Sequence, residues 1–235
     1  MNRRLLLTSL RERLYETLKE DILLNKYKPG AELQIDKLAQ EFGVSTTPIR
    51  EALVRLEGDG LVVSIPNRGV QVAPISLDDV KNIYEVRRLL EPHAAKIAAR
   101  YCEEVEVNAL YEKLLKIIEG PTDVGTYINA DLELHDLMFK HLSNTLLRDI
   151  LDQVDQHSIR IRYLVEGNAG GLRPEVVELV TREHLKILDA VSKRDEEKAA
   201  AATLQHLINA EARTLQSLEG VVTIQGGETL VHHSL

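Results

Sequence analysis

Apolar residues recur every three or four positions along most of the chain, which is the spacing of helices with one buried face. The first pattern of this kind predicts a helix over 10–24, with Leu10, Leu14, Leu18 and Ile22 as its apolar positions. A short helix is expected over 35–41, before Gly43. A third helix follows Ser45, and its inner face consists of Ile49, Ala52, Leu53 and Leu56.

The pattern changes after Gly58-Asp59-Gly60, a run that stops the third helix. Residues 61–65 read as a strand, 66–69 as a turn and 70–73 as a returning strand. Two helices, a glycine turn, a third helix and then a hairpin follow one another as in a winged helix-turn-helix, a DNA-binding fold. The first 75 residues are therefore predicted to form a DNA-binding domain, and the alternative is a small helical subdomain with incidental charges.

The third helix turns polar side chains away from its apolar face. Thr46, Thr47 and Arg50 lie on its first turns, where a helix in the major groove reaches base edges. Arg50 has the donor fork that binds guanine or phosphate, and Arg55 and Arg68 are expected at phosphates or in the minor groove. The predicted DNA-binding residues are Ser45, Thr46, Thr47, Arg50, Arg55, Arg68 and Gly69.

The remaining chain is nearly all helical in pattern. Six helices are expected, over 77–101, 105–119, 127–141, 145–165, 174–193 and 195–218. Pro92 should kink the first of them or remove one of its backbone hydrogen bonds. The fold class is thus mainly α. Its predicted parts are a winged helix-turn-helix at 1–75, a helical domain at 76–220 and a flexible tail at 221–235.

The net charge of −8 argues at first against nucleic acid as a partner. The charge is unevenly distributed, however, because residues 1–75 carry 11 Lys and Arg against 10 Asp and Glu, and the rest carries 18 against 27. The acidity therefore belongs to the helical domain. The single cysteine, Cys102, excludes a disulfide framework and a cysteine zinc site. No apolar run approaches the roughly 18 residues of a membrane span, and a cytoplasmic protein is expected.

Four residues of the helical domain have the spacing of a metal site. Asp131 and His135 are four positions apart and face the same way on one helix, and His184 and His206 lie on two later helices that run antiparallel. Nitrogen and oxygen ligands without thiolate suit a divalent transition metal such as Zn, Ni or Mn. The alternative is that each histidine is an ordinary hydrogen-bonded core residue, as we expect for His93, His141 and His157 when they are not exposed.

Arg87 and Asn144 are the predicted effector-binding residues. Arg87 can bind a carboxylate bidentately, and Asn144 can add a hydrogen bond. The alternative for Arg87 is a surface ion pair with Glu91, four residues later. A further alternative is an HD-type phosphohydrolase, because His135 and Asp136 are adjacent, although a general base is not evident.

Several sequence runs resemble a known family. The runs 29–33, 43–53 and 66–70 resemble the DNA-binding domain of GntR-family transcription regulators. The run 85–92 resembles the opening helix of the FCD effector domain in the FadR-like subfamily. The metal-binding version of that domain is matched by Asp131, His135, Asn144, Glu183, His184 and His206.

The resemblance implies a transcription regulator and not an enzyme. Its effector domain would be a bundle of six or seven helices that binds a small carboxylate at a metal and forms a homodimer. Such a dimer would place two recognition helices on a palindromic operator and repress or activate transcription. A purely structural metal in a regulator that senses something else stays open.

Overall fold

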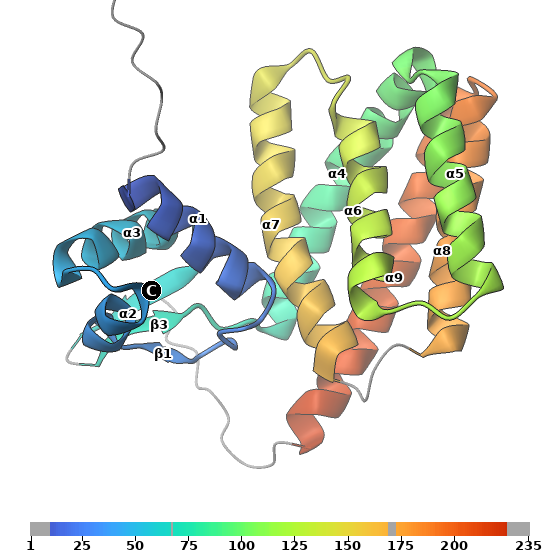
Figure 1. The fold of residues 1–235 in the computed structure, drawn as a ribbon. Coiled ribbons are helices and arrows are strands. Elements are labelled where there is room, and N and C mark those ends of the chain that lie inside the picture. Colours follow the sequence, from blue (N-terminus) through green and yellow to red (C-terminus); the bar gives the residue numbers. More distant parts are fainter. Residues whose placement is uncertain (1–9, 67, 169–172, 225–235) are drawn as a thin grey trace, which may run out of the picture. The chain divides into compact units, whose positions relative to one another are not determined.

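The computed structural model describes residues 10–66, 68–168 and 173–224 and confirms a mainly helical fold with a small antiparallel sheet (Figure 1). The elements of the N-terminal part are α1 (Leu10–Leu23), β1 (Glu32–Leu33), α2 (Ile35–Phe42), α3 (Thr46–Gly58), β2 (Val62–Ile65) and β3 (Gly69–Val72). Those of the C-terminal part are α4 (Leu77–Tyr101), α5 (Glu104–Glu119), α6 (Val124–Phe139), α7 (Thr145–Asn168), α8 (Pro174–Ser192) and α9 (Glu196–Ile224).

The chain divides into two compact units. The first comprises Met1–Ser76 and also Asp149–Leu164, the middle of α7, and the second comprises Leu77–Arg148 and Val165–Leu235. Two hydrogen bonds join this part of α7 to the rest of the first unit, from Asn25 Nδ2 to the carbonyl of Arg160 and from Arg160 Nη2 to the carbonyl of Ala73. The sequence pattern, which predicted 76–220 as one domain, gave no sign of this assignment.

The sheet has three strands in the order β1-β3-β2, with both pairs antiparallel. β2 and β3 form the predicted hairpin, with Val62 opposite Val72 and Ile65 opposite Gly69. The sequence analysis missed β1, whose Leu33 pairs with Val70. A strand of two residues is too short to show the alternation by which strands are recognised.

The core of the first unit is formed by the apolar faces that the periodicity predicts. Leu18 and Ile22 of α1 and Ile49 and Leu56 of α3 are fully buried within one cluster. Leu61 and Val72 extend this cluster to the sheet. The hydrophobic contact between α1 and α3 therefore holds the helix-turn-helix together.

Replacing Leu18 with alanine should lower the free energy of unfolding by about 2–5 kcal/mol, because a fully buried leucine is exchanged for a cavity. Urea unfolding followed by circular dichroism measures the change. Val54→Ala on α3 is the matched control, since Val54 is 67% exposed and its loss should change stability by about 0.5 kcal/mol or less. Equal effects of the two substitutions would contradict the assigned core.

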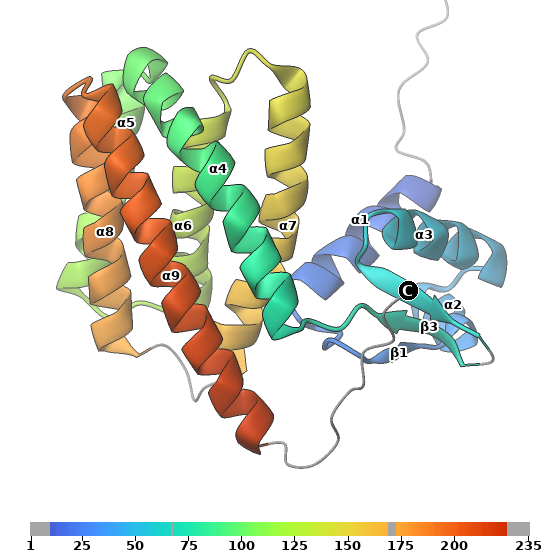
Figure 2. The same ribbon diagram turned by 180° about the vertical axis from the view of Figure 1, so that it is seen from behind.

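The second unit is built around the pair α4 and α9, which lie side by side in Figure 2. α8 packs on α9 and α5, and α6 packs on α4 and α5. Pro92 lies inside α4 without ending it. α6 begins three residues earlier than predicted, because Asp123 caps it by accepting a hydrogen bond of 2.9 Å from Thr126 N.

Some sequence predictions fall partly outside the described residues. The tail predicted from residue 221 is helical as far as Ile224, and 225–235, with His232 and His233, lie outside the described part. Asn67 of the predicted turn and 169–172 of the loop before α8 also lie outside it. Among the described residues, no helix is long and apolar enough to cross a membrane.

Candidate functional site

The exposed face of α3 carries three residues in helical register. Thr47, Arg50 and Val54 are exposed, while Ile49 and Leu53 between them are buried. Spacings of three and four positions place the exposed side chains on one side of the helix. Val54 was not among the predicted DNA-binding residues, and its apolar side chain suits contact with a thymine methyl group.

Two of the predicted DNA-binding residues, Ser45 and Arg55, are exposed, and their positions on α3 differ. Ser45 occupies the N-cap position of α3, and its side chain makes no cap hydrogen bond. Arg55 donates from Nη1 to Glu12 on α1 at 2.8 Å, and its guanidinium lies 3.8 Å from the centre of the Tyr15 ring. Arg55 therefore joins α3 to α1 in this structure.

The turn between β2 and β3 presents Arg68 and Gly69, which are both exposed. Gly69 has a φ of +85°, a conformation that L side chains rarely adopt. The backbone N–H of Arg68 donates to the carbonyl of Ile65 at 3.0 Å and tightens the turn. The turn thus places the positively charged side chain of Arg68 at the tip of the wing.

The predicted metal ligands meet inside the second unit. Asp131 and His135 come from α6, His184 from α8 and His206 from α9, and all four are buried. One ligand atom from each of Asp131, His135 and His206 lies within 4.8 Å of the other two. His184 Nε2 is 3.2 Å from Asp131 Oδ1, and the His184 ring packs edge-on against His206 with centroids 4.6 Å apart.

The donor set fits a divalent transition metal. Bonds of about 2.0–2.2 Å to nitrogen and oxygen place two ligands of one ion at most about 4.4 Å apart. The separation of up to 4.8 Å among Asp131, His135 and His206 needs only a small contraction to meet this limit. The set contains three imidazoles and one carboxylate, which are typical ligands of Zn, Ni and Mn.

Arg87 and Glu91 of α4 lie beside His135. Both are buried, with exposed fractions of 1% and 2%, and Arg87 Nε donates to Glu91 Oε1 at 2.5 Å. Glu91 Oε2 is 3.3 Å from His135 Nδ1, and Arg87 Nη2 is 3.3 Å from His135 Nε2. The ion pair that the sequence analysis considered as a surface feature therefore exists, but it is in the core and touches a predicted ligand.

The electrostatics of this pair keep Glu91 charged. Burial by itself opposes ionisation, but the Arg87 guanidinium and His135 outweigh it and hold the pKa of the Glu91 carboxyl below its ordinary value. A charged Glu91 oxygen 3.3 Å from His135 Nδ1 favours the tautomer with the ring proton on Nδ1, which leaves Nε2 with the lone pair. The nitrogen that faces Arg87 and Asp131 is then the one that can ligate a metal.

Glu183 of α8 has the corresponding position beside His206. Its Oε2 is 2.8 Å from His206 Nδ1, and Asn209 and Arg213 of α9 also donate to the carboxylate. Burial raises the pKa of the Glu183 carboxyl, but the hydrogen bonds from these three partners outweigh burial and lower the pKa to about 2. Burial in turn lowers the pKa of His206, which favours the neutral imidazole that binds metals.

The sequence did not show that these two carboxylates hold histidines of the site, although Glu183 belongs to the pattern that matches the metal-binding FCD domain and Glu91 was considered as a partner of Arg87. Glu183 precedes the ligand His184 directly, and Glu91 follows Arg87 by four positions, but charged residues at such spacings are also common on helix surfaces. Asn144, in contrast, is exposed and caps α7 by accepting from Leu147 N at 3.1 Å. This position gives no support to the predicted effector contact of Asn144.

Substituting Glu183 with glutamine should weaken metal binding by about 10–100-fold, because the carboxylate that orients His206 becomes a neutral amide. Titration with Zn²⁺ against a chromophoric chelator measures the affinity. Glu178→Gln is the matched control on the same helix, since Glu178 is exposed and pairs with Arg182. The control should bind zinc like the parent protein, and an equal loss in both variants would argue against the orienting role.

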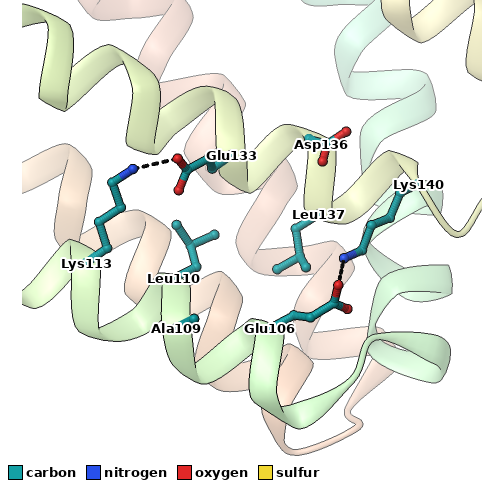
Figure 3. A pocket seen from close by; sticks show the side chains of 8 residues that line it. All are labelled: Glu106, Ala109, Leu110, Lys113, Glu133, Asp136, Leu137 and Lys140. Atoms are coloured by element: carbon teal, nitrogen blue, oxygen red, sulfur yellow. Dashed lines mark hydrogen bonds and ion pairs between the residues drawn. The ribbon is translucent and has the colours of Figure 1, made fainter.

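A surface hollow of about 360 Å³ lies between α5 and α6 (Figure 3). Leu110 and Leu137 lie between two ion pairs in the close-up, Lys113 with Glu133 and Lys140 with Glu106. The lysines are thus matched by carboxylates from the facing helix. None of the predicted metal ligands lines this hollow.

Cys102 lies just after α4 and is buried. Its thiol donates to the carbonyl of Leu137 at 3.5 Å. Burial raises the pKa of the Cys102 thiol to about 11, so that the thiolate is scarce at neutral pH.

Comparison with known proteins matches both units. The profile of the bacterial regulatory proteins of the gntR family matches residues 10–72, and that of the FCD domain matches residues 82–209. The chain belongs to the GntR family, with an FCD domain. The resemblance to the GntR family and to its FCD domain is therefore confirmed, and the protein is a transcription regulator and not an enzyme.

The HTH-type transcriptional regulator YdhC of Bacillus subtilis is 31% identical over 198 residues, which cover 82% of this chain and 85% of YdhC. The transcriptional repressor RspR of Escherichia coli is 29% identical over 198 residues, covering 83% of this chain and 85% of RspR. The structure of E. coli McbR/YncC has a TM-score of 0.70 at 21% identity and covers 92% of this chain and 98% of that one. A metal-free FCD domain, that of TM0439, has a TM-score of 0.50 at 18% identity, over 63% of this chain and 99% of that one. These two structures support the fold.

Proposed function

We propose that this GntR-family member represses transcription from a palindromic operator under the control of a small carboxylate. The carboxylate would bind a divalent transition metal held by Asp131, His135, His184 and His206. The observation that carries the proposal is the meeting of these four buried ligands from three helices, with a buried arginine beside them. An oxygen of the small carboxylate can complete the coordination of the ion, and Arg87 can bind a second carboxylate group of the same molecule.

Four protein ligands leave two positions open on an octahedral ion. Zn, Ni and Mn all accept this donor set, so the class of metal is proposed and not one member. The small carboxylate must bind one arrangement of the protein more tightly than another, because equal affinity for both shifts no equilibrium. The repressor assignment draws on the name of RspR, which is called a transcriptional repressor.

Thermal melting with and without a chelator tests the metal part of this proposal. A bound metal should raise the melting temperature, and a carboxylate that coordinates it should raise it further only when the metal is present. Lactate, citrate and sugar acids form a suitable panel. If a carboxylate stabilised the chelator-treated protein as much as the loaded one, direct coordination would be wrong and the metal would be purely structural.

The DNA-binding part of the proposal rests on α3 and the wing. We assign the major groove to the face of Thr47, Arg50 and Val54, with Ser45 and Thr46 at the start of the helix. Arg68 and Gly69 of the wing would contact the backbone or the minor groove. A homodimer would place two such helices about 34–36 Å apart, in successive major grooves of the operator. We place this regulator in the cytoplasm, where its operator is accessible.

The proposed homodimer has a candidate contact face on α4 and α9. The ion pairs Arg88–Glu211 and Arg100–Glu196 join the two helices and set their antiparallel register. In this register Leu89 lies level with Ile208, and these side chains are 71% and 45% exposed. Two large apolar side chains at the same height on neighbouring helices suit the centre of a two-fold interface.

A further inference from the structure

The guanidinium of Arg87 and a metal ion would use the same atom of His135. Arg87 Nη2 lies 3.3 Å from His135 Nε2. The other ring nitrogen, Nδ1, faces Glu91 Oε2 at 3.3 Å. With the ring proton on Nδ1, Nε2 has the lone pair, and it can accept a hydrogen bond from Arg87 or bind a metal, but not both at once.

We propose that Arg87 competes with the metal for His135 and that metal binding turns its guanidinium toward the carboxylate ligand. The inference rests on the proposed metal site and deepens it. It makes Arg87 an antagonist of metal binding in the absence of a carboxylate, as well as a contact for the carboxylate in its presence. Binding of the metal would then raise the affinity for the carboxylate, and binding of the carboxylate would raise the affinity for the metal, both through Arg87.

The surroundings of Arg87 allow such a movement without loss of its charge partner. Arg87 Nε donates to Glu91 Oε1 at 2.5 Å, and Glu91 lies one turn further along the same helix. The Tyr84 ring lies 4.9 Å from the guanidinium carbon, one turn before it. The guanidinium is planar and rigid about its Nε–Cζ bond. Small changes in the side-chain torsions before Nε can therefore move Nη2 away from His135 while Nε stays within hydrogen-bond reach of Glu91.

Electrostatic repulsion also favours the movement of Arg87 away from His135 when a metal binds. A divalent cation at His135 Nε2 would repel a guanidinium at hydrogen-bond distance, and this repulsion is strong in a buried site. The carboxylate of the incoming ligand lies between two cations in the final state and attracts both. A carboxylate is therefore the chemical group that best relieves the repulsion between Arg87 and the metal.

The first experiment measures zinc affinity in the absence of carboxylates, using the full chain and a competing chelator. Arg87→Met should bind Zn²⁺ at least tenfold more tightly than the parent protein, since the competing donor and its charge are gone. A merely structural role predicts the opposite sign, because loss of Arg87 leaves Glu91 buried without its ion pair and His135 poorly held. Tighter binding thus supports the proposal, and equal or weaker binding overturns it.

Arg213→Met is the matched control. Arg213 is also an arginine near the site, but it pairs with Glu183 and not with a ligand nitrogen. Its loss should leave zinc affinity unchanged or lower. Equal tightening in both variants would show a general effect of positive charge and overturn the competition for His135.

A second pair of variants covers the case in which Arg87→Met fails to fold. Arg87→Gln combined with Glu91→Gln removes both charges, and Glu91→Gln alone is its reference. The double variant should bind zinc more tightly than the single one, and weaker or equal binding overturns the proposal. If the parent protein itself binds no zinc, the proposed function fails, which is a separate result.

Acetate is the probe for the carboxylate step. In the parent protein, zinc should raise acetate affinity by about fivefold or more, and acetate should raise zinc affinity by the same factor. In Arg87→Met this mutual effect should decrease at least severalfold. An undiminished effect would show that acetate is held by the metal alone and would overturn the second half of the proposal.

Discussion

Replacing His135 with alanine should abolish tight binding of a divalent metal and, with it, the response of DNA binding to a carboxylate. His135 is one of the four proposed metal ligands, and its loss also removes the nitrogen that Arg87 contacts. Since substitutions that only orient a ligand cost about 10–100-fold in affinity, the loss of a ligand itself should cost on the order of 100-fold or more. Zinc titration measures the first consequence, and operator binding with and without a carboxylate measures the second.

The His135→Ala variant should also lose the increase in folding stability that a bound metal gives the parent protein. At a metal concentration of 100 times the dissociation constant, a bound ligand stabilises the folded state by about 2.7 kcal/mol. His93→Ala is the matched control, because His93 is exposed on α4, the helix that carries Arg87 and Glu91. If the His135 variant kept its metal while the control lost it, the assigned ligands would be wrong.

Arg50→Ala should reduce binding to the operator by about 1–3 kcal/mol and relax sequence preference at one base pair in each half-site. Arg50 is exposed on the same face of α3 as Thr47, where a donor fork can reach a guanine edge. Binding of the variant to selected and random duplexes at several salt concentrations gives both the affinity and the preference. Affinity for random duplexes should change much less than affinity for the operator.

Arg55→Ala is the informative comparison for this prediction. Arg55 lies on the same helix, but it pairs with Glu12 and stacks on Tyr15. Its loss should therefore lower the free energy of unfolding and leave the base preference of the protein nearly unchanged. If Arg55→Ala relaxed the base preference and Arg50→Ala did not, the recognition face would have to be assigned to the other side of α3.

The elements of the first unit could be predicted because local signals determine them. α1, α2, α3 and the hairpin each have an apolar period or a turn residue of their own, and each lies within a few residues of the predicted bounds. β1 is the exception, since Leu33 is a strand residue only through its pairing with Val70 of β3. A pairing between distant segments leaves no periodic signal in either.

The candidate site was predictable in part for the same reason. The spacing of Asp131 and His135 shows that they share a helix face, but their meeting with His184 and His206 depends on how three helices pack. The burial of Glu91 depends on that packing too, because an arginine and a glutamate four positions apart look the same on a surface and in a core. Asn144 is the opposite case, since its capping of α7 is a local role.

The single cysteine of the chain, Cys102, is protected from oxidants by its burial. A protonated sulfur enclosed by the protein reacts slowly with peroxide and with alkylating reagents. The regulator should therefore keep its response under oxidative stress that inactivates proteins with exposed, acidic thiols. Metal titrations can accordingly be run without reducing agents, which are themselves chelators, so that the measured zinc affinity belongs to the protein alone.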